Sequence, residues 1–178
     1  MTMKITQANL CSELAELGKS QPLFVIMIGA PGSGKSTFLS SLKNHMPFVI
    51  ASTDDQIEAH AAINGLTYSQ AFEQISFKTL KQRMKLMLFE AVSQSKHVFI
   101  DQTNMSRKSR SEKLKLAVFR HVKIAVDFEV PSEVVLERLK ARELATGKVI
   151  PKSVFYSMMK AYEAPTCDEG FNRVYTVC

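Results

Sequence analysis

Nine consecutive residues have the types and the spacing of a loop that binds phosphate groups. They read Gly29-Ala30-Pro31-Gly32-Ser33-Gly34-Lys35-Ser36-Thr37 and contain the pattern G-x-x-x-x-G-K-[ST]. Glycines in such a loop let successive backbone N–H groups point to one side, where they can bind phosphate oxygens. We expect Lys35 to reach the β- and γ-phosphates of a nucleoside triphosphate, and the Ser36 hydroxyl to coordinate Mg²⁺. A glycine-rich turn without a ligand is the alternative.

Two carboxylates, Asp54 and Asp55, follow a short apolar run at residues 48–50. In open α/β sheets ligands bind beyond the carboxyl ends of the strands, so Asp54 is expected to face the phosphate loop. There it can act as a general base that accepts the proton of an attacking hydroxyl, with Asp55 in contact with the substrate. Acidic residues also suit a helix N-terminus, and a helix cap without chemistry stays an alternative.

Two arginines, Arg138 and Arg142, are spaced i and i+4 and so lie on one face of an expected helix. Arginines placed over a triphosphate neutralise charge on the transferring phosphoryl group. Together with Lys35 and Asp54 they complete the predicted catalytic set. The loop at residues 145–148 would let this segment act as a lid that excludes water. A solvated basic helix face is the alternative.

A third polar stretch, Asp101-Gln102-Thr103-Asn104, ends the apolar run at residues 97–101. Asp101 is expected to hold Mg²⁺ through water or, alternatively, to orient the base and the substrate. The next three residues are expected to contact the substrate together with Arg107. A basic helix begins after this stretch. The side chains expected to contact a nucleic-acid backbone are Arg107, Lys108, Arg110, Lys81, Arg83 and Lys85.

The elements that must position these residues alternate between strands and helices. Strands are predicted at 22–28, 48–50, 97–101, 122–130 and 171–178. This alternation predicts one α/β domain over residues 21–178, with a parallel sheet of about five strands covered by helices on both faces. Residues 1–20 are expected to be a helical N-terminal extension. A long helix should run from a capping box at Thr67 to Ser93. Its expected buried side chains are Phe72, Ile75, Leu80, Met84, Met87 and Leu88, and Phe89 is also assigned to the core.

Charge and composition narrow the class of partner. The chain has 178 residues and a formal net charge of +6, with a pI near 9.3. An anionic partner is expected, and a nucleic acid explains a whole-chain excess better than a nucleotide alone, although an ordinary basic enzyme stays an alternative. The three cysteines form no disulfide or metal pattern, which favours a reducing compartment. No membrane segment is expected, so the predicted location is the cytoplasm (the host cytoplasm if the protein is viral). The oligomeric state is not predicted.

The order of these motifs resembles the kinase domain of phage polynucleotide 5′-kinases. The resemblance covers about residues 22–165 and includes the phosphate loop, Thr53-Asp54-Asp55, Asp101 to Asn104, and Val130-Pro131 leading to the two arginines. It implies the P-loop kinase fold with a helical lid, ATP and Mg²⁺ as cofactors, and Asp54 as general base. It implies an ATP-dependent phosphotransferase with an alcohol acceptor, here a hydroxyl on DNA or RNA.

The resemblance leaves the acceptor open between two nucleic-acid hydroxyls. The family has an arginine three residues after the catalytic aspartate, where this chain has Ile57. The chain is also similar to phage kinases that phosphorylate 5-hydroxymethyluracil in DNA, and an apolar Ile57 would suit such a base. The acceptor is therefore expected to be a 5′ end or a hydroxymethylated pyrimidine. The alternatives are a small-molecule kinase, acting on a nucleoside, nucleotide or sugar, and a non-catalytic ATP-binding switch.

Overall fold

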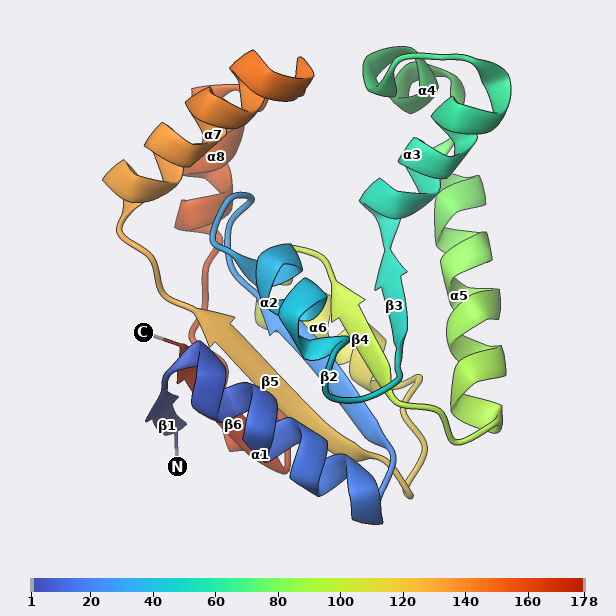
Figure 1. Cartoon of the computed structure of the whole chain (residues 1–178), viewed down its shortest axis with the longest axis vertical. Coiled ribbons are helices and arrows are strands. Elements are labelled where there is room, and N and C mark those ends of the chain that lie inside the picture. Colours follow the sequence, from blue (N-terminus) through green and yellow to red (C-terminus); the bar gives the residue numbers. More distant parts are fainter. Residues whose placement is uncertain (1, 178) are drawn as a thin grey trace.

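Six parallel strands form one sheet at the centre of the computed structural model (Figure 1). The structure describes residues 2–177, so the ends of the expected ranges at residues 1 and 178 lie outside the described residues. Across the sheet the strands lie in the order β1-β6-β5-β2-β4-β3. Their bounds are β1 (Thr2–Ile5), β2 (Leu23–Ile28), β3 (Val49–Ser52), β4 (Val98–Asp101), β5 (Val122–Phe128) and β6 (Arg173–Val177).

The sheet confirms the expected α/β class and has one strand more than the five predicted. The extra strand, β1, pairs with β6 at the edge of the sheet. Sequence patterns missed it because it has only four residues, three of them exposed, and so carries no apolar alternation. Helix α1 (Gln7–Ser20) follows β1, and its Leu10 and Leu14 are fully buried in the main core. Residues 2–20 therefore pack as part of the sheet and its core.

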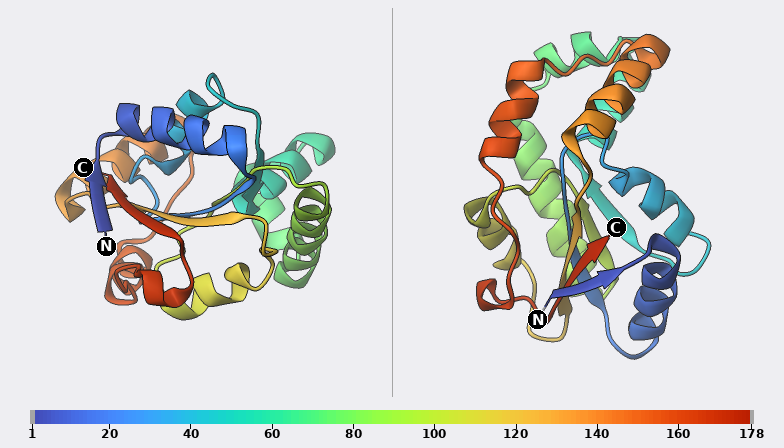
Figure 2. Two further views of the ribbon diagram at one scale, coloured as in Figure 1. Left: turned by 90° about the horizontal axis from the view of Figure 1, so that it is seen from below. Right: turned by 90° about the vertical axis from the view of Figure 1, so that its left-hand side faces the viewer.

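Helices cover both faces of the sheet (Figure 2). Helix α1 and helix α2 (Lys35–Leu42) pack on one face, where Phe38, Leu39 and Leu42 join the core. Helix α5 (Phe77–Ser93) and helix α6 (Arg107–Leu114) pack on the other face through Met84, Leu88 and Leu114. The remaining helices are α3 (Thr53–Asn64), α4 (Tyr68–Gln74), α7 (Ser132–Thr146), α8 (Lys152–Lys160) and the short η1 (Cys167–Glu169).

The helix predicted from Thr67 to Ser93 is two helices. The expected capping box forms between Thr67 and Gln70, but α4 ends at Gln74. The Ser76 side chain then accepts a hydrogen bond from the Thr79 N–H and begins α5, because Ser is a strong N-cap. Phe72, before the break, is 42% exposed, and Phe89, which lies beside the buried Leu88 on α5, is 73% exposed, so their assignment to the core was wrong.

Two pairs of helices rise on either side of the carboxyl ends of the strands (Figure 1). Helices α3 and α4 form one arm, and α7 and α8 form the other. The chain runs from β2 outward to β3, returns to β4 beside β2, and crosses to β5 on the other flank of β2. The carboxyl end of β2 is thus the topological switch point, where open α/β sheets bind ligands. Among the helices of residues 2–177, none is both long and apolar enough to span a bilayer.

Candidate active site

The phosphate loop follows β2, whose six residues are all buried. Gly29 has φ +143°, and a Cβ there would lie 2.7 Å from the Ser33 Oγ, so only glycine fits without rearrangement. Gly34 is the N-cap of α2 with φ +105°, a conformation that L side chains rarely adopt. The loop therefore ends on the positive N-terminus of α2, as the motif predicts, and residues 29–37 have the backbone for binding a phosphate.

Lys35 is buried at the base of this loop. Its ammonium donates to the carbonyl oxygens of Gly29 at 2.8 Å and Ala30 at 2.9 Å. Burial lowers the pKa of Lys35 to about 8, although the charges of Asp101 and Asp54 raise it. The Lys35 ammonium is thus poorly solvated, and nearby anionic groups such as Asp101 and Asp54 stabilise its protonated form.

Ser36 and Asp101 form the candidate Mg²⁺ site. The Ser36 hydroxyl donates to Asp101 Oδ2 at 2.7 Å. Burial raises the pKa of Asp101, while the bond from Ser36 and the charge of Lys35 lower it only in part. No cluster of three or more His, Cys, Asp or Glu suited to a metal occurs within residues 2–177. Mg²⁺ is usually held by one or two protein oxygens together with phosphates and water, and the Ser36 hydroxyl and the Asp101 carboxylate would supply two such oxygens.

Asp54 lies at the N-terminus of α3, and its side chain is half-exposed. Its Oδ1 accepts a hydrogen bond from the Tyr68 hydroxyl at 2.9 Å, and its Oδ2 accepts one from Lys148 Nζ at 2.7 Å. An Arg142 Nη2 lies 4.0 Å from Oδ2. Burial raises the pKa of Asp54, but Lys148, Tyr68 and Arg142 outweigh it and hold the pKa below its usual range. A carboxylate has about four lone-pair sites, and two hydrogen bonds use about half of them. Asp54 can therefore accept a further hydrogen bond from another donor.

The arm formed by α7 and α8 contacts both the phosphate loop and Asp54. Arg138 Nη1 donates to the Gly32 carbonyl oxygen at 3.3 Å. The loop residue Ala30 also packs with Val135 and Leu139 of α7 in a small apolar cluster. At the far end of the arm, Lys148 lies 3.8 Å from the centre of the Tyr68 ring as well as against Asp54. One segment therefore joins the two halves of the predicted site.

Lys148 and Tyr68 contact Asp54, a role that no sequence pattern predicted, although Lys148 lies in the expected lid loop at residues 145–148. Tyr68 follows Thr67, the N-cap of α4, and Lys148 follows Gly147, which ends α7. Each residue therefore lies at a helix end, where the local sequence gives no sign of a role in the site. Lys148 and Asp54 are 94 residues apart. No spacing in the chain could have paired them, because their contact depends on how the two arms fold over the sheet.

The polar stretch after β4 is divided between the site and the scaffold. Asp55 is exposed near Asp101, whose pKa it raises. Gln102 Nε2 donates to Thr53 Oγ1 at 3.1 Å, and the Thr103 carbonyl accepts from the Gly29 N–H at 3.0 Å. Asn104 is buried, and its amide donates to the Met27 carbonyl at 2.6 Å. Asn104 thus supports β2 from within, and the prediction that it contacts substrate was wrong.

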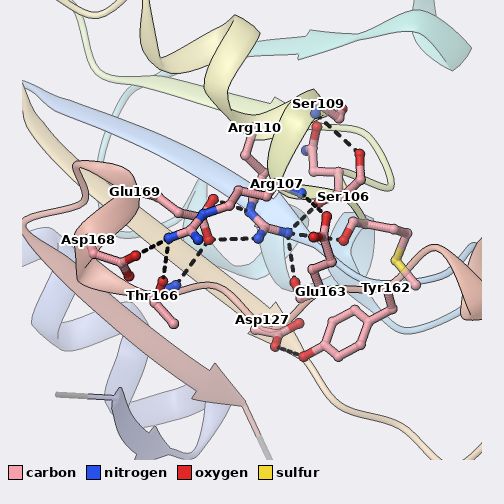
Figure 3. Close-up of polar contacts among 12 residues, drawn as sticks. Ser106, Arg107, Ser109, Arg110, Asp127, Tyr162, Glu163, Thr166, Asp168 and Glu169 are labelled. Atoms are coloured by element: carbon pink, nitrogen blue, oxygen red, sulfur yellow. Dashed lines mark hydrogen bonds and ion pairs between the residues drawn. The ribbon is translucent and has the colours of Figure 1, made fainter.

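Two arginines expected at the substrate are instead part of the scaffold (Figure 3). The Arg110 side chain is fully buried in a pair with Glu169, and its guanidinium also donates to three backbone carbonyls. It cannot contact a nucleic-acid backbone, so that prediction was wrong. Arg107 is exposed but is paired with Asp168 and bonded to Thr166. Both arginines hold the segment at residues 163–169 against α6.

Ile57 is also a core residue. It is 2% exposed and packs with Ala61, Ala71 and Leu80 between α3, α4 and α5. It does not line the site beside Asp54, so it carries no information about an acceptor. The suggestion that an apolar Ile57 favours a modified base is therefore wrong.

The chain is similar to proteins of known family. Residues 24–165 match the AAA_33 family, described as an AAA domain. "Transcription factor bHLH140" from Arabidopsis thaliana is 30% identical over 167 residues, which is 91% of this chain and 16% of that protein. The "Bifunctional polynucleotide phosphatase/kinase" of Schizosaccharomyces pombe is 27% identical over 166 residues, which is 86% of this chain and 33% of that protein. The chain thus spans a third or less of these two relatives.

A solved structure shares the fold. A chain of the "Pnkp1/Rnl/Hen1 RNA repair complex" aligns with a TM-score of 0.63 and 24% identity, over 79% of this chain and 44% of that chain. At this identity the likeness concerns the fold, which is that of P-loop kinases. The expected fold class is confirmed.

Proposed function

From the premise that the chain belongs to the AAA_33 family of AAA domains, we propose that it is an ATP- and Mg²⁺-dependent kinase that phosphorylates a hydroxyl of a nucleic acid. One observation carries the proposal: the α7–α8 arm brings Arg138 to the phosphate loop and Arg142 and Lys148 to Asp54. A nucleotide switch needs the loop and a carboxylate that holds Mg²⁺, but it needs no general base for an acceptor hydroxyl. A kinase needs all three.

Each residue has a role in the proposed reaction. Asp54 accepts the proton of the acceptor hydroxyl while that oxygen bonds to the γ-phosphorus of ATP, and the bond to the leaving ADP oxygen breaks. Lys35, Arg138 and Arg142 stabilise the negative charge that spreads over the transferring group. Ser36 and Asp101 would hold Mg²⁺, which neutralises charge on the phosphates. The loop amides of residues 29–37 orient the triphosphate.

Two observations support a nucleic-acid acceptor. The net charge of +6 favours a polyanionic partner. The relative from S. pombe, 27% identical over 86% of this chain, carries a polynucleotide kinase in its name. The acceptor is either a 5′-hydroxyl end or the hydroxymethyl group of 5-hydroxymethyluracil in DNA.

The test is phosphate transfer from γ-labelled ATP to a panel of acceptors. The panel holds DNA and RNA with 5′-hydroxyl ends, DNA containing 5-hydroxymethyluracil, and free nucleosides and sugars. Transfer to a strand supports the proposal. Transfer to nucleosides or sugars alone would make the protein a small-molecule kinase, and tight ATP binding without any transfer would make it a switch.

Asp54→Asn should lower kcat by about 10² to 10⁴, the usual contribution of a general base. ATP affinity should stay nearly unchanged, because the phosphate loop is untouched. The matched control is Asp168→Asn, an exposed carboxylate paired with Arg107 away from Asp54. Wild-type turnover in Asp54→Asn would show that another group is the base.

A further inference from the structure

Three aromatic side chains form a continuous series where α4 meets α5. The rings of Tyr68 and Phe72 stack with centroids 6.3 Å apart, and Phe72 meets Phe77 edge-on at 5.5 Å. Phe72 is 42% exposed and Phe77 is 63% exposed. Large apolar rings that contact one another yet remain in solvent are unlike core residues, and such exposed groups mark interaction sites. We call these three residues the aromatic series.

The aromatic series begins at the candidate base. The Tyr68 hydroxyl donates to Asp54 Oδ1 at 2.9 Å, so the first ring is in direct contact with the group proposed to activate the acceptor. The next two rings lead outward from that point along α4 to the start of α5. A polymer whose reacting end lies at Asp54 would therefore pass over Phe72 and Phe77.

The surface that continues from the aromatic series is basic. Residues 68–93 contain two acidic residues, Glu73 and Glu90, and four basic ones. The basic residues are all exposed and are Lys78, Lys81, Arg83 and Lys85. None of the four takes part in an ion pair within residues 2–177. Phe77 and Lys81 are spaced i and i+4, so a ring and a cation share one face of α5.

We propose that the aromatic series and the basic residues of α5 form a platform for single-stranded nucleic acid next to the reacting nucleotide. Bases stack on the exposed faces of Phe72 and Phe77, and the lysines contact the phosphates. Proteins that bind single strands combine these two features, because every base has a face that can stack. This inference rests on the proposed function and adds where the strand lies. A second copy of the chain would explain exposed rings but not the unpaired cations beside them.

The first test measures binding of a fluorescently labelled 5′-hydroxyl DNA or RNA oligonucleotide without ATP. Phe72→Ala and Phe77→Ala should each weaken it by about 5- to 150-fold, the range expected for loss of one stacked base. The matched control is Phe89→Ala, a 73% exposed ring on the same helix, about 18 Å farther along its axis. It should bind like wild type. Equal binding by all variants would overturn the platform.

Further measurements separate the platform from other roles of the rings. Phe72→Tyr keeps a ring and should restore binding, whereas a variant that simply unfolds would show a lower melting temperature. At saturating oligonucleotide the alanine variants should keep wild-type kcat, with the change confined to KM. Sedimentation that shows a dimer broken by Phe77→Ala, with no strand bound, would assign the rings to self-association instead.

The binding test and the transfer test can contradict the two proposals independently. Strand binding that depends on Phe72 and Phe77 without any phosphate transfer would sink the proposed kinase and leave the platform standing. Transfer to a strand that is indifferent to both rings would leave the kinase standing and sink the platform.

Discussion

Two clusters in this molecule each pair a carboxylate with basic side chains, but they differ in how far they are exposed to solvent. On the α6 face, Arg110 and Glu169 are 0% and 1% exposed, and the guanidinium makes two bonds to the carboxylate. Beside the phosphate loop, Asp54 is 50% exposed and meets Lys148 and Arg142. The first cluster joins segments that must stay together. The second joins the two arms between which, in the proposed function, the substrate binds.

The difference lies in how completely each cluster is satisfied. All three guanidinium nitrogens of Arg110 donate to Glu169 or to the carbonyls of Asn104, Met105 and Glu163, and the side chain is fully buried, so no ligand can reach it. Asp54 retains free lone pairs, and its hydrogen-bond partners are the Tyr68 hydroxyl and the Lys148 ammonium. A charge that is buried and saturated is structural, and a charge left half-solvated with spare acceptors is available for chemistry.

The largest effect should follow from breaking the buried pair. Arg110→Met leaves the Glu169 carboxylate unpaired in the interior, which costs about 3–5 kcal/mol of the free energy of unfolding. At this chain length each kcal/mol lowers the melting temperature by roughly 2–4 °C. Calorimetry or thermal denaturation followed by circular dichroism measures it.

Arg107→Met is the matched control, because it lies on the same helix and its pair with Asp168 is exposed. Exposed pairs are worth about 1 kcal/mol or less. Arg110→Met combined with Glu169→Leu should recover part of the loss, since no unpaired charge remains. Equal losses in Arg110→Met and Arg107→Met would contradict a special role for the buried pair.

A smaller effect, on the pH dependence of activity, should follow from breaking the Asp54 cluster. Lys148→Met removes the hydrogen bond and charge that hold the pKa of Asp54 below its usual range. The pKa should rise, so the acidic limb of the kcat/KM profile should move to higher pH. Stability should change by about 1 kcal/mol or less, because Asp54 is half-exposed.

Lys140→Met is the control for that variant. Lys140 is an exposed lysine of α7 outside the ion pairs found in residues 2–177. It should keep the wild-type pH profile. A limb that does not move in Lys148→Met would mean that Asp54 is not the group titrating in that profile.

The smallest effect is a pH dependence of ATP binding in the unmodified protein. Burial lowers the pKa of Lys35 to about 8, so the free protein carries this charge below pH 8 and loses it above. Phosphate binding favours the charged form, and affinity should therefore fall as pH rises beyond 8, by at most about tenfold per pH unit. Calorimetric titration at pH 7 to 9.5 measures this. The arginine in Lys35→Arg stays charged over this range, so the ATP affinity that this variant retains should not change with pH.

Much of the fold and part of the site follow from local patterns. The phosphate loop, Asp54 in the first turn of α3, and the two arginines on α7 were each predicted from residues close together in the chain. Predictions failed where the environment decides the role of a side chain. Arg110 and Asn104 belong to polar stretches whose composition predicts exposure to solvent, yet both side chains are buried. Phe72 sits in an apolar pattern, yet its side chain is exposed.

The sequence by itself determined the phosphate-loop backbone at residues 29–37, because a tight glycine loop between a buried strand and a helix is a local property. It also determined the parallel sheet, through the alternation of strands and helices. Only the tertiary structure decided that Lys148 reaches Asp54 across 94 residues and that Tyr68 completes the cluster. Such contacts depend on the relative placement of two arms, and no short-range pattern encodes that placement.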